Sequence, residues 1–430
     1  MTEALIGLIA MLLLILARIP VAVAMALVGF IGLGLLRNWN AAVSMVSAVI
    51  FESAFQYLLS VLPLFILMGN LVTESRMSRD LYQAAYRFLG HRRGGLAMST
   101  VVACGGFGAI CGSSLATAAT MSRVAYPEMR QLGYSKELAT GSIAAGGTLG
   151  ILIPPSIVMV VYCILTEQSI GKMFAAGVLP GLLAITCYLM AVLWTVWRDP
   201  NAGPAGERSS WHERLQSLKK VWAILTLIMM LLGGIYAGIF TPAEAAGIGA
   251  FLGFVFAWSR GSLTPRKFFA IVTESGRTTG MIFFILIGAL MLANFINFTT
   301  MPDDLRDLIL GNDIDPVLVV VAMCIIYILL GCVLESMSMI LLTVPVFYPL
   351  IDALGLDLIW FGIIVVVVTE ISFITPPLGL NVFVIRGLVP DVSTNTIFRG
   401  VAPFVVADAV RLAILIAFPS ISLYLTQFVR

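Results

Sequence analysis

The two halves of this chain carry prolines and glycines in the same register. Tyr126-Pro127 has its counterpart in Tyr348-Pro349, and Pro154-Pro155 in Pro376-Pro377, in both cases 222 positions further along. Apolar motifs recur easily by chance, but prolines and glycines set backbone geometry, so a shared spacing among them is hard to obtain by accident. The sequence therefore predicts an internal duplication, which restricts the fold to two copies of one unit.

Composition identifies lipid as the solvent of this fold. Apolar residues make up 60% of the 430 residues and charged residues 11%, and the mean hydropathy is +1.02. A soluble chain of this length needs more polar surface, whereas long apolar runs suit membrane spans of about 20 residues. The net charge of +2 gives no basis for nucleic-acid binding. We expect an all-α polytopic membrane protein whose first apolar run is a retained span, because no basic residue precedes it.

Charge indicates how each copy is oriented. Segment 76–93 holds five arginines against one aspartate, and its counterpart 302–315 holds five aspartates against one arginine. Basic loops stay in the cytoplasm, so the first segment is expected inside and the second outside. The copies at 1–198 and 221–430 then have inverted topology, and the basic segment 199–220 is a cytoplasmic linker. Both chain ends are predicted to lie on the periplasmic side.

About five spans account for most of each copy, and the rest does not resemble ordinary spans. A glycine- and serine-rich centre at 105–114 makes 94–127 a re-entrant hairpin, with 316–350 as its counterpart. A second interruption ends in Pro-Pro within 135–166 and again within 358–388. Proline blocks the continuation of a helix, so each copy is predicted to contain one broken helix. Irregular backbone at membrane depth survives only when protein or a wet cavity covers it.

Two further segments, 39–58 and 265–279, mix polar and apolar residues and are expected to lie at the membrane interface as braces. Each precedes a span with a Phe-Ile-Leu-x-Gly motif, which ends at Gly69 in the first copy and at Gly288 in the second. These glycines are expected to serve as hinges or close-packing points between the braces and a moving body.

Paired breaks in inverted copies are the best sequence indication of a transporter's binding site. Carbonyl and hydroxyl oxygens at the breaks suit Na⁺, and half-helix N-termini attract an anionic substrate. Small residues and prolines also ease helix packing, and a single break would favour that explanation. Four paired breaks favour a function instead. The hydroxyls at the breaks belong to Ser113, Ser114, Thr148, Ser156, Ser336, Ser338, Thr369, Ser372 and Thr375.

Few charged residues lie within the apolar segments, and each is informative. Glu335 lies on the second hairpin tip and is expected to face a cavity, whereas Glu370 either faces the cavity or binds loop amides. Asp408 and Arg411 are three residues apart on one span and are expected to neutralise each other.

Two other functions remain open from the residues alone, an intramembrane hydrolase and an ion channel. The only histidines, His91 and His212, lie in polar loops, so the serines of the first hairpin tip lack a histidine base within the membrane. This weakens the hydrolase hypothesis and any histidine proton relay.

The chain resembles, nearly end to end, the large membrane subunit of tripartite ATP-independent periplasmic (TRAP) transporters. Four segments carry the resemblance: 62–69, 108–117, 147–156 and 375–381. The resemblance implies a bacterial inner-membrane protein with an elevator-type fold, a scaffold domain and a transport domain. It also implies Na⁺-driven import of an organic acid, a periplasmic substrate-binding protein, a small four-helix membrane subunit, and no organic cofactor.

The resemblance also assigns roles to the residues at the breaks. The first Na⁺ site is expected at Ser113, Ser114, Gly147 and Thr148, and the second at Glu335, Ser336, Ser338, Thr369 and Thr375. Substrate contacts are expected from Ser114, Pro154, Pro155, Ser336, Pro376 and Pro377. Because Glu335 takes the place of Ser113 in the second copy, the two ion sites are expected to differ in detail.

Overall fold

The computed structural model describes residues 2–75, 77–312 and 314–429, and every regular element in these ranges is helical. The helices of the first half and the linker are α1 (Thr2–Leu16), α2 (Val21–Leu36), α3 (Trp39–Phe55), η1 (Tyr57–Ser60), α4 (Val61–Glu74), α5 (Met77–Leu89), α6 (Gly95–Cys111), α7 (Ser114–Gln131), α8 (Lys136–Leu152), α9 (Ile157–Thr166), α10 (Ile170–Arg198) and α11 (Trp211–Lys220). Those of the second half are α12 (Trp222–Tyr236), α13 (Pro242–Ser259), α14 (Pro265–Asn297), α15 (Met301–Gly311), α16 (Pro316–Gly331), α17 (Ser336–Ala353), α18 (Leu358–Ser372), α19 (Leu380–Leu388), α20 (Thr394–Ala417), α21 (Ser420–Leu423) and η2 (Leu425–Phe428).

The two halves repeat the same helix order. Helix α17 begins 222 positions after α7, and α18 begins 222 positions after α8, which is the offset that the prolines show. Local capping explains several of these starts. Thr241, for example, accepts a hydrogen bond from the backbone of Glu244 while the Glu244 carboxylate accepts one from the backbone of Thr241, which forms a capping box at the start of α13.

Within the described ranges, seven helices are long and apolar enough to cross a bilayer, or eight if α11 and α12, bent by 54°, count as one. Helices α1 and α2 have 15 and 16 residues. At about 1.5 Å per residue they are about 23 Å long, shorter than a hydrocarbon core of about 30 Å. The seven or eight longer apolar helices of the described ranges make the chain a multi-pass membrane protein by length and composition.

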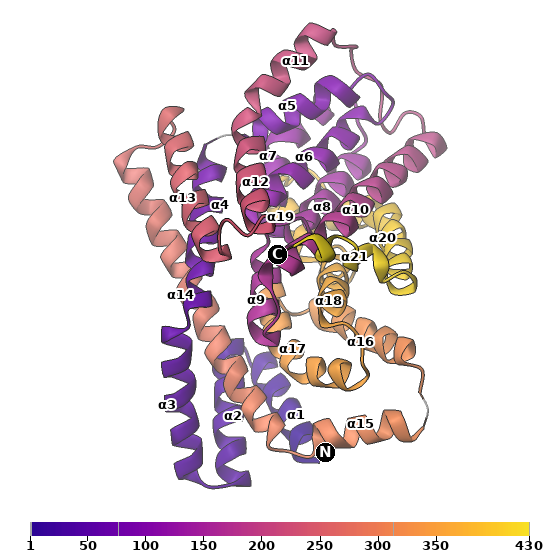
Figure 1. Ribbon diagram of the computed structural model, residues 1–430. Coiled ribbons are helices and arrows are strands. Elements are labelled where there is room, and N and C mark those ends of the chain that lie inside the picture. Colours follow the sequence, from indigo (N-terminus) through magenta and orange to yellow (C-terminus); the bar gives the residue numbers. More distant parts are fainter. Residues whose placement is uncertain (1, 76, 313, 430) are drawn as a thin grey trace.

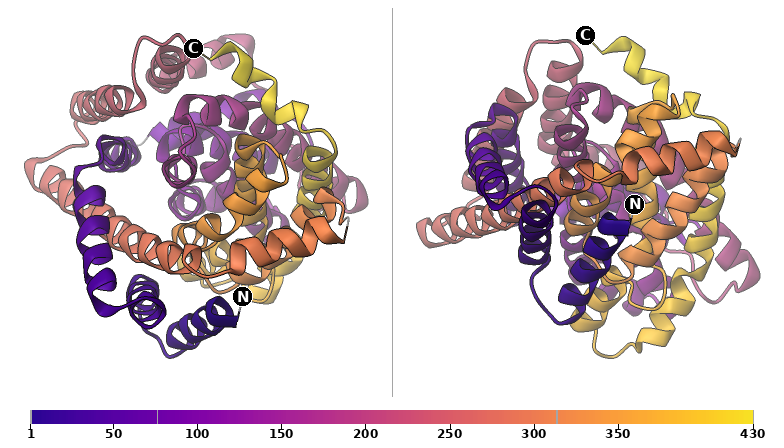
Figure 2. Two further views of the ribbon diagram at one scale, coloured as in Figure 1. Left: turned by 60° about the horizontal axis from the view of Figure 1, so that its bottom comes forward. Right: turned by 90° about the horizontal axis from the view of Figure 1, so that it is seen from below.

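The helices form two groups (Figures 1 and 2). One group, here called the frame, consists of α1–α4 and α12–α14, in which α2 packs along α14 and α13 packs along α4. The other, here called the core body, consists of α6–α10 and α16–α20. Its centre is α8, which contacts α6 and α7 from its own half and α20 from the other.

The two broken helices of the core body run antiparallel. At one end, the Tyr162 hydroxyl of α9 donates to the carbonyl of Leu358, where α18 begins. At the opposite end, Lys136 at the start of α8 forms a salt bridge of 3.3 Å with Asp391, which follows α19. The Tyr126 hydroxyl also donates to Asp391, and this bond, with Lys136, holds the pKa of Asp391 below its usual value. Inverted copies require this reciprocal arrangement.

The predicted basic and acidic segments lie at opposite ends of the molecule. Helices α5 and α11 are at the top of Figure 1, whereas α15 and the N-terminal end of the chain are at the bottom. Arg76 and Asp313, which belong to the two charged segments, lie outside the described residues. The separation agrees with inverted topology, and which end faces the cytoplasm stays a prediction.

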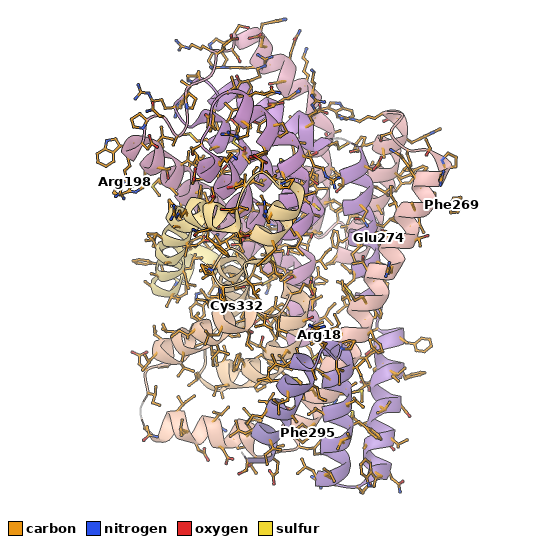
Figure 3. All side chains as sticks on the ribbon, turned by 180° about the vertical axis from the view of Figure 1, so that it is seen from behind. Arg18, Arg198, Phe269, Glu274, Phe295 and Cys332 are labelled. Atoms are coloured by element: carbon orange, nitrogen blue, oxygen red, sulfur yellow. The ribbon has the colours of Figure 1, made fainter. Side chains whose placement is uncertain are left out.

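One predicted element is wrong. The proposed interfacial brace at 265–279 is continuous with the following span, and together they form the 33-residue helix α14. Phe269, Glu274 and Phe295 mark successive positions along it (Figure 3). No proline interrupts this stretch after Pro265 at its first position, and Gly276 and Gly280 near the expected boundary remain helical. In the first copy, by contrast, the extended backbone of Gln56 separates α3 from η1 and α4.

Candidate functional site

The first hairpin turns at a single glycine. Helix α6 ends at Cys111, Gly112 has a φ of +63°, and Ser113 is extended and directly precedes α7. A left-handed φ favours glycine, because a Cβ would crowd the backbone there. The Ser113 side chain accepts a hydrogen bond from the N–H of Ala116 and so caps α7. This turn places Ser113 and Ser114 at the N-terminus of α7.

The other glycines near the first break are helical, contrary to prediction. Helix α8 continues through Gly147 and Thr148 to Leu152, and α6 runs through Gly105, Gly106 and Gly108. A Cβ on Gly108 would lie 2.6 Å from the Cα of Gly150, so these two glycines allow α6 and α8 to touch along their backbones, whereas Gly147 packs against Ala118 of α7. The packing explanation holds for them.

The breaks of the two broken helices are correspondingly shorter than predicted. They cover residues 153–156 and 373–379, and both Pro-Pro pairs are cis. Thr369 and Ser372 therefore lie inside α18, where their hydroxyls donate to the carbonyls of Val365 and Thr369.

The second hairpin turns through residues 332–335. Helix α16 ends at Gly331, α17 begins at Ser336, and half-buried Glu335 precedes α17 in an extended conformation. Its carboxylate lies 3.5 Å from the Ser336 hydroxyl. A carboxylate at a helix N-terminus is favourably placed in the field of the backbone dipoles.

Both hairpin tips line one cavity of about 320 Å³. Ser113 and Ser114 come from the first tip and Glu335 and Ser336 from the second, as predicted. The frame closes the cavity with α4 and α14. Its polar contributions are Asn70, Glu274 and Thr278.

Other predicted site residues lie outside this cavity. Thr148 is fully buried, and its hydroxyl donates to the carbonyl of Ala145. Thr375 donates to the carbonyl of Ile371 within its own chain segment. The remaining predicted residues that do not line the cavity are Gly147, Pro154, Pro155, Ser338, Thr369, Pro376 and Pro377. Of the prolines, the first pair is buried and the second exposed.

Asn381 belongs to the site and was not predicted to. Its amide oxygen and nitrogen lie 3.0 and 2.9 Å from the Ser114 hydroxyl, and the nitrogen also donates to the carbonyl of Ala144. Asn381 is fully buried near the start of α19. It thus ties the first hairpin tip to the second broken helix. The available signal was its position four residues after Pro377, within a segment that carries the family resemblance.

Three charged side chains are buried together beside the broken helices. Arg411 is 2.9 Å from Asp408, the pairing expected from their spacing, and it also donates to Glu370 at 2.7 Å. All three are 0% exposed. Glu370 therefore neither faces the cavity nor binds loop amides, and the group has a formal charge of −1.

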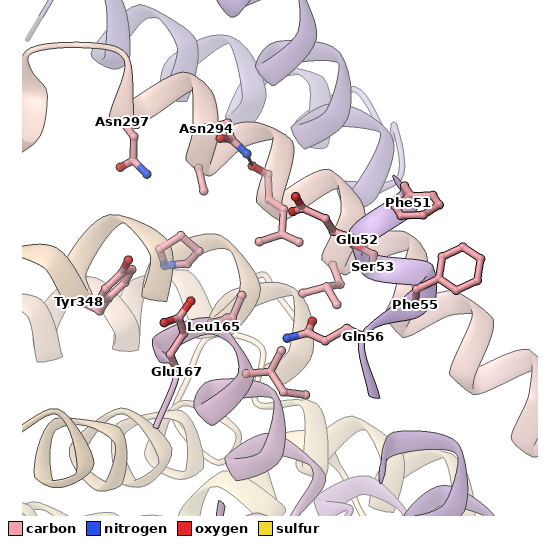
Figure 4. A pocket seen from close by; sticks show the side chains of 15 residues that line it. Phe51, Glu52, Ser53, Phe55, Gln56, Leu165, Glu167, Asn294, Asn297 and Tyr348 are labelled. Carbon is pink, nitrogen blue, oxygen red and sulfur yellow. Dashed lines mark hydrogen bonds between the residues drawn. The ribbon is translucent and has the colours of Figure 1, made fainter. Parts of the chain in front are cut away.

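A second cavity, of about 580 Å³, separates the frame from the core body (Figure 4). Its frame side is lined by α3 and α14, and its body side by the C-terminal end of α9 and the second half of α17. The side chains of Glu52, Gln56 and Glu167 face it. Glu167 has a φ of +55°, which is uncommon for a residue with a side chain.

This architecture, two antiparallel copies whose re-entrant tips meet at a cavity beside a frame, defines a multi-pass membrane transport protein. The family model described as "Tripartite ATP-independent periplasmic transporter, DctM component" matches residues 8–421. The chain belongs to this family, which confirms a TRAP large membrane subunit rather than an enzyme. It is accordingly a multi-pass protein of the inner membrane.

Curated relatives agree with the family. The chain is 38% identical over 385 residues to the C4-dicarboxylate TRAP transporter large permease protein DctM of Pseudomonas aeruginosa, covering 88% of each chain. It is 34% identical to the DctM protein of Vibrio cholerae, covering 95% of this chain and 94% of the relative. It is also 31% identical to the ectoine TRAP transporter large permease protein TeaC of Halomonas elongata, covering 84% of each.

Among solved structures, the YdaH transporter of Alcanivorax borkumensis has a similar fold. The TM-score is 0.61 at 14% identity, with 86% of this chain and 89% of that chain covered. At this identity the similarity concerns the fold alone.

Proposed function

We propose that this chain is the membrane-crossing path of a Na⁺-driven importer of an organic acid. The observation that carries the proposal is the meeting of both hairpin tips at one cavity. Helices α7 and α17 both begin at this cavity, and serines stand at their N-termini. Helix N-termini favour anions, whereas hydroxyls and carbonyls suit Na⁺, so the tips combine both requirements of a cation-coupled anion carrier.

The first Na⁺ site is proposed at the tip of the first hairpin, at Ser113 and Ser114, with Ser114 held in place by Asn381. Thr148, one turn from the Ala144 carbonyl that Asn381 contacts, extends this site on its buried side. The second is proposed at Glu335, Ser336 and Ser338, with the residues of the 373–379 break. Glu335 supplies a charge that the first site lacks, so the second site is the more strongly electrostatic.

The substrate is proposed to be a carboxylate that binds between the two tips. Relatives named for C4-dicarboxylates support this class. Another relative is named for ectoine, so membership of the family does not by itself identify the substrate. None of the described residues lining the cavity is basic. Two carboxylates, of Glu335 and Glu274, lie at the cavity and repel an anion. The anion is therefore proposed to bind after Na⁺, which offsets their negative charge.

Transport is proposed to proceed by sliding of the core body against the frame, with substrate delivered by a periplasmic binding protein. A small membrane subunit is proposed to pack on the frame. A relative from Oleidesulfovibrio alaskensis, named an isethionate TRAP transporter permease protein DctMQ, is longer, and this chain covers 58% of it. That relative supports a second membrane subunit as partner.

The test is uptake by proteoliposomes that contain the chain, its small subunit and the binding protein. Radiolabelled succinate, a C4-dicarboxylate, is the first probe, followed by other carboxylates. Accumulation is expected with a Na⁺ gradient and not with a pH gradient alone. Uptake driven by a pH gradient without Na⁺ would contradict the coupling, and single-channel conductance would favour a channel.

A further inference from the structure

A line of buried polar contacts joins the two broken helices through side chains that line neither cavity. The Thr148 hydroxyl of α8 lies 3.1 Å from the Tyr188 hydroxyl of α10. Tyr188 donates to Asp408 of α20 at 2.8 Å, and Asp408 pairs with Arg411 at 2.9 Å. Arg411 then donates to Glu370 of α18 at 2.7 Å. All five side chains are fully buried.

Thr148 has one hydroxyl proton and two acceptors within reach. The carbonyl of Ala145 is 2.7 Å away and the Tyr188 oxygen 3.1 Å away. Since the Tyr188 proton goes to the Asp408 carboxylate, the Tyr188 oxygen is free to accept. A hydroxyl whose oxygen binds a cation points its O–H away from the cation, and the Tyr188 oxygen is the side-chain acceptor on offer to Thr148. Asp408 polarises Tyr188 and makes it a better one.

The ring of Tyr188 is held in place for this role. Phe404 packs edge-on against it with ring centroids 5.6 Å apart, and the Arg411 guanidinium lies 5.8 Å from the ring centroid. Both contacts come from α20, in the opposite copy. Tyr188 therefore connects Thr148, a residue of the proposed first ion site, to α20 of the second copy.

The far end of this line has spare bonding capacity. Oε1 of Glu370 and Nε and Nη1 of Arg411 have no hydrogen-bond partner among the described residues. Buried groups of this kind are usually satisfied, so these atoms can accept or donate further hydrogen bonds. Glu370 follows Thr369 on the last turn of α18, just before the 373–379 break. A change of pairing at Arg411 therefore reaches the second break directly.

We infer that Tyr188 is a positioning residue that couples the two ion sites, so that Na⁺ at the first raises the affinity of the second. Na⁺ at Thr148 turns the hydroxyl's hydrogen bond from the Ala145 carbonyl to the Tyr188 oxygen. This change in hydrogen bonding passes through Asp408 and Arg411 to Glu370. Coupling between sites is reciprocal, so loss of the line weakens both. The inference rests on the proposed Na⁺ coupling.

The test uses the large subunit purified together with its small subunit, with Na⁺ as the probe. Thermal stabilisation is titrated with NaCl against choline chloride at constant ionic strength, because a ligand of the folded state raises its stability. The slope of the stability against the logarithm of the Na⁺ concentration gives the number of ions bound, and this number, followed over the titration, gives the half-saturating concentration and the Hill coefficient. The variant is Tyr188→Phe. Its matched control is Tyr162→Phe, which removes an equally buried tyrosine hydroxyl that donates to Leu358, away from this line.

Tyr188→Phe is expected to raise the half-saturating Na⁺ concentration about five-fold, the value of one buried hydrogen bond. The Hill coefficient is expected to fall toward one, with the same number of ions bound at high Na⁺. Tyr162→Phe is expected to leave both quantities at their wild-type values. If Tyr188→Phe does not accumulate, Asp408→Asn replaces it, because it keeps an acceptor for Tyr188 and removes the charge that Arg411 pairs with.

The outcomes separate the two claims. A wild-type complex that NaCl stabilises no more than choline chloride would contradict the proposed Na⁺ coupling itself. A Na⁺-stabilised wild type with a Hill coefficient of one would overturn the inference alone. So would a Tyr188→Phe complex that titrates like Tyr162→Phe, or one that loses stability equally at all Na⁺ concentrations, since that result indicates only a structural role.

Discussion

Arg411 is the side chain whose loss the structure predicts to be most costly. It is the only cation in contact with the fully buried carboxylates of Glu370 and Asp408 among the described residues. Arg411→Met would leave both carboxylates without a counter-ion at membrane depth. Breaking a buried pair in this way typically costs about 3–5 kcal/mol. We expect little folded protein, measured as monodisperse complex after detergent extraction.

Asp408→Asn is the matched comparison, because it leaves a neutral Arg411–Glu370 pair and an amide oxygen that still accepts from Tyr188. Its yield of monodisperse complex is expected to stay near wild type. If Asp408→Asn lost as much protein as Arg411→Met, the charge argument would be wrong, and shape rather than charge would govern this site.

Ser114 is expected to act on Na⁺ affinity before it affects transport. Ser114→Ala removes a hydroxyl that lines the cavity and contacts Asn381. Na⁺-dependent uptake is expected to need a several-fold higher Na⁺ concentration and to recover partly when Na⁺ is raised. The control is Ser122→Ala on the same helix, where the hydroxyl only donates to the carbonyl of Ala118. Equal Na⁺ midpoints for the two variants would remove Ser114 from the ion site.

At the residue scale, the positions of the helix breaks could be predicted from the sequence, whereas the contacts between side chains at those breaks mostly could not. Ser114 and Glu335 were predictable, because each follows the end of a half-helix. Asn381 was not, because its partner Ser114 lies 267 positions away and only the fold brings them together. Glu370 was ambiguous for the same reason, since its partner Arg411 lies on a different helix.

At the scale of elements, the repeated Phe-Ile-Leu-x-Gly motif serves two different contacts. A Cβ on Gly69 would lie 2.9 Å from the carbonyl oxygen of Cys111, at the first hairpin tip. A Cβ on Gly288 would lie 2.4 Å from the carbonyl oxygen of Ala22, inside the frame. Only Gly69 therefore lies between the frame and the core body, and the two glycines are not equivalent hinges.

Gly69→Ala is expected to disturb ion binding as well as movement. The added methyl group presses on Cys111, next to the turn that holds Ser113. We expect a higher Na⁺ midpoint and slower uptake. The control is Gly247→Ala in α13, where the nearest atom, of Leu64, is 3.9 Å from the added Cβ. Slower uptake at an unchanged Na⁺ midpoint would instead make Gly69 a purely mechanical contact.

Helix boundaries were predictable where a residue dictates geometry and uncertain where it only permits one. Pro-Pro interrupts the helix in both copies, as predicted, because proline lacks a donor and clashes with the preceding turn. Glycine merely tolerates a break, so Gly147 could not reveal that close packing against Ala118 keeps α8 helical. The continuity of α14 was missed because its charged first turns resemble an interfacial helix.

At the scale of the whole molecule, inverted topology predicts opposite accessibility of two exposed positions. Arg92 follows α5 and Asn312 follows α15. Single cysteines there, in a background without the six buried native thiols, are expected to react with an impermeant maleimide from the cytoplasmic and periplasmic sides respectively. Ser78, in the same basic segment, is buried and unsuitable for labelling. Labelling of both positions from one side would contradict the inverted copies.

The duplication and the charge pattern made the overall arrangement predictable, because a chain that is repeated and inverted has few ways to pack. The salt bridge of Lys136 with Asp391 and the bond of Tyr162 to Leu358 are contacts that only antiparallel copies make. Which helices belong to the frame and which to the core body could not be predicted from the sequence. It depends on which apolar faces meet, and apolar side chains pack with little directional preference.

The cavity between the frame and the core body offers a direct test of sliding. Glu167 belongs to the core body, and the opposite wall is formed by α3 and α14 of the frame. If the body slides, access to position 167 must differ between conformations. A Glu167→Cys variant is expected to react with an impermeant maleimide at a rate that changes several-fold when Na⁺ and the loaded binding protein replace K⁺ at equal ionic strength.

Asn312→Cys, exposed beside α15 and away from this cavity, is expected to keep its rate. A constant ratio of the two rates across all conditions would show that the cavity walls do not move relative to each other, and sliding would have to be abandoned.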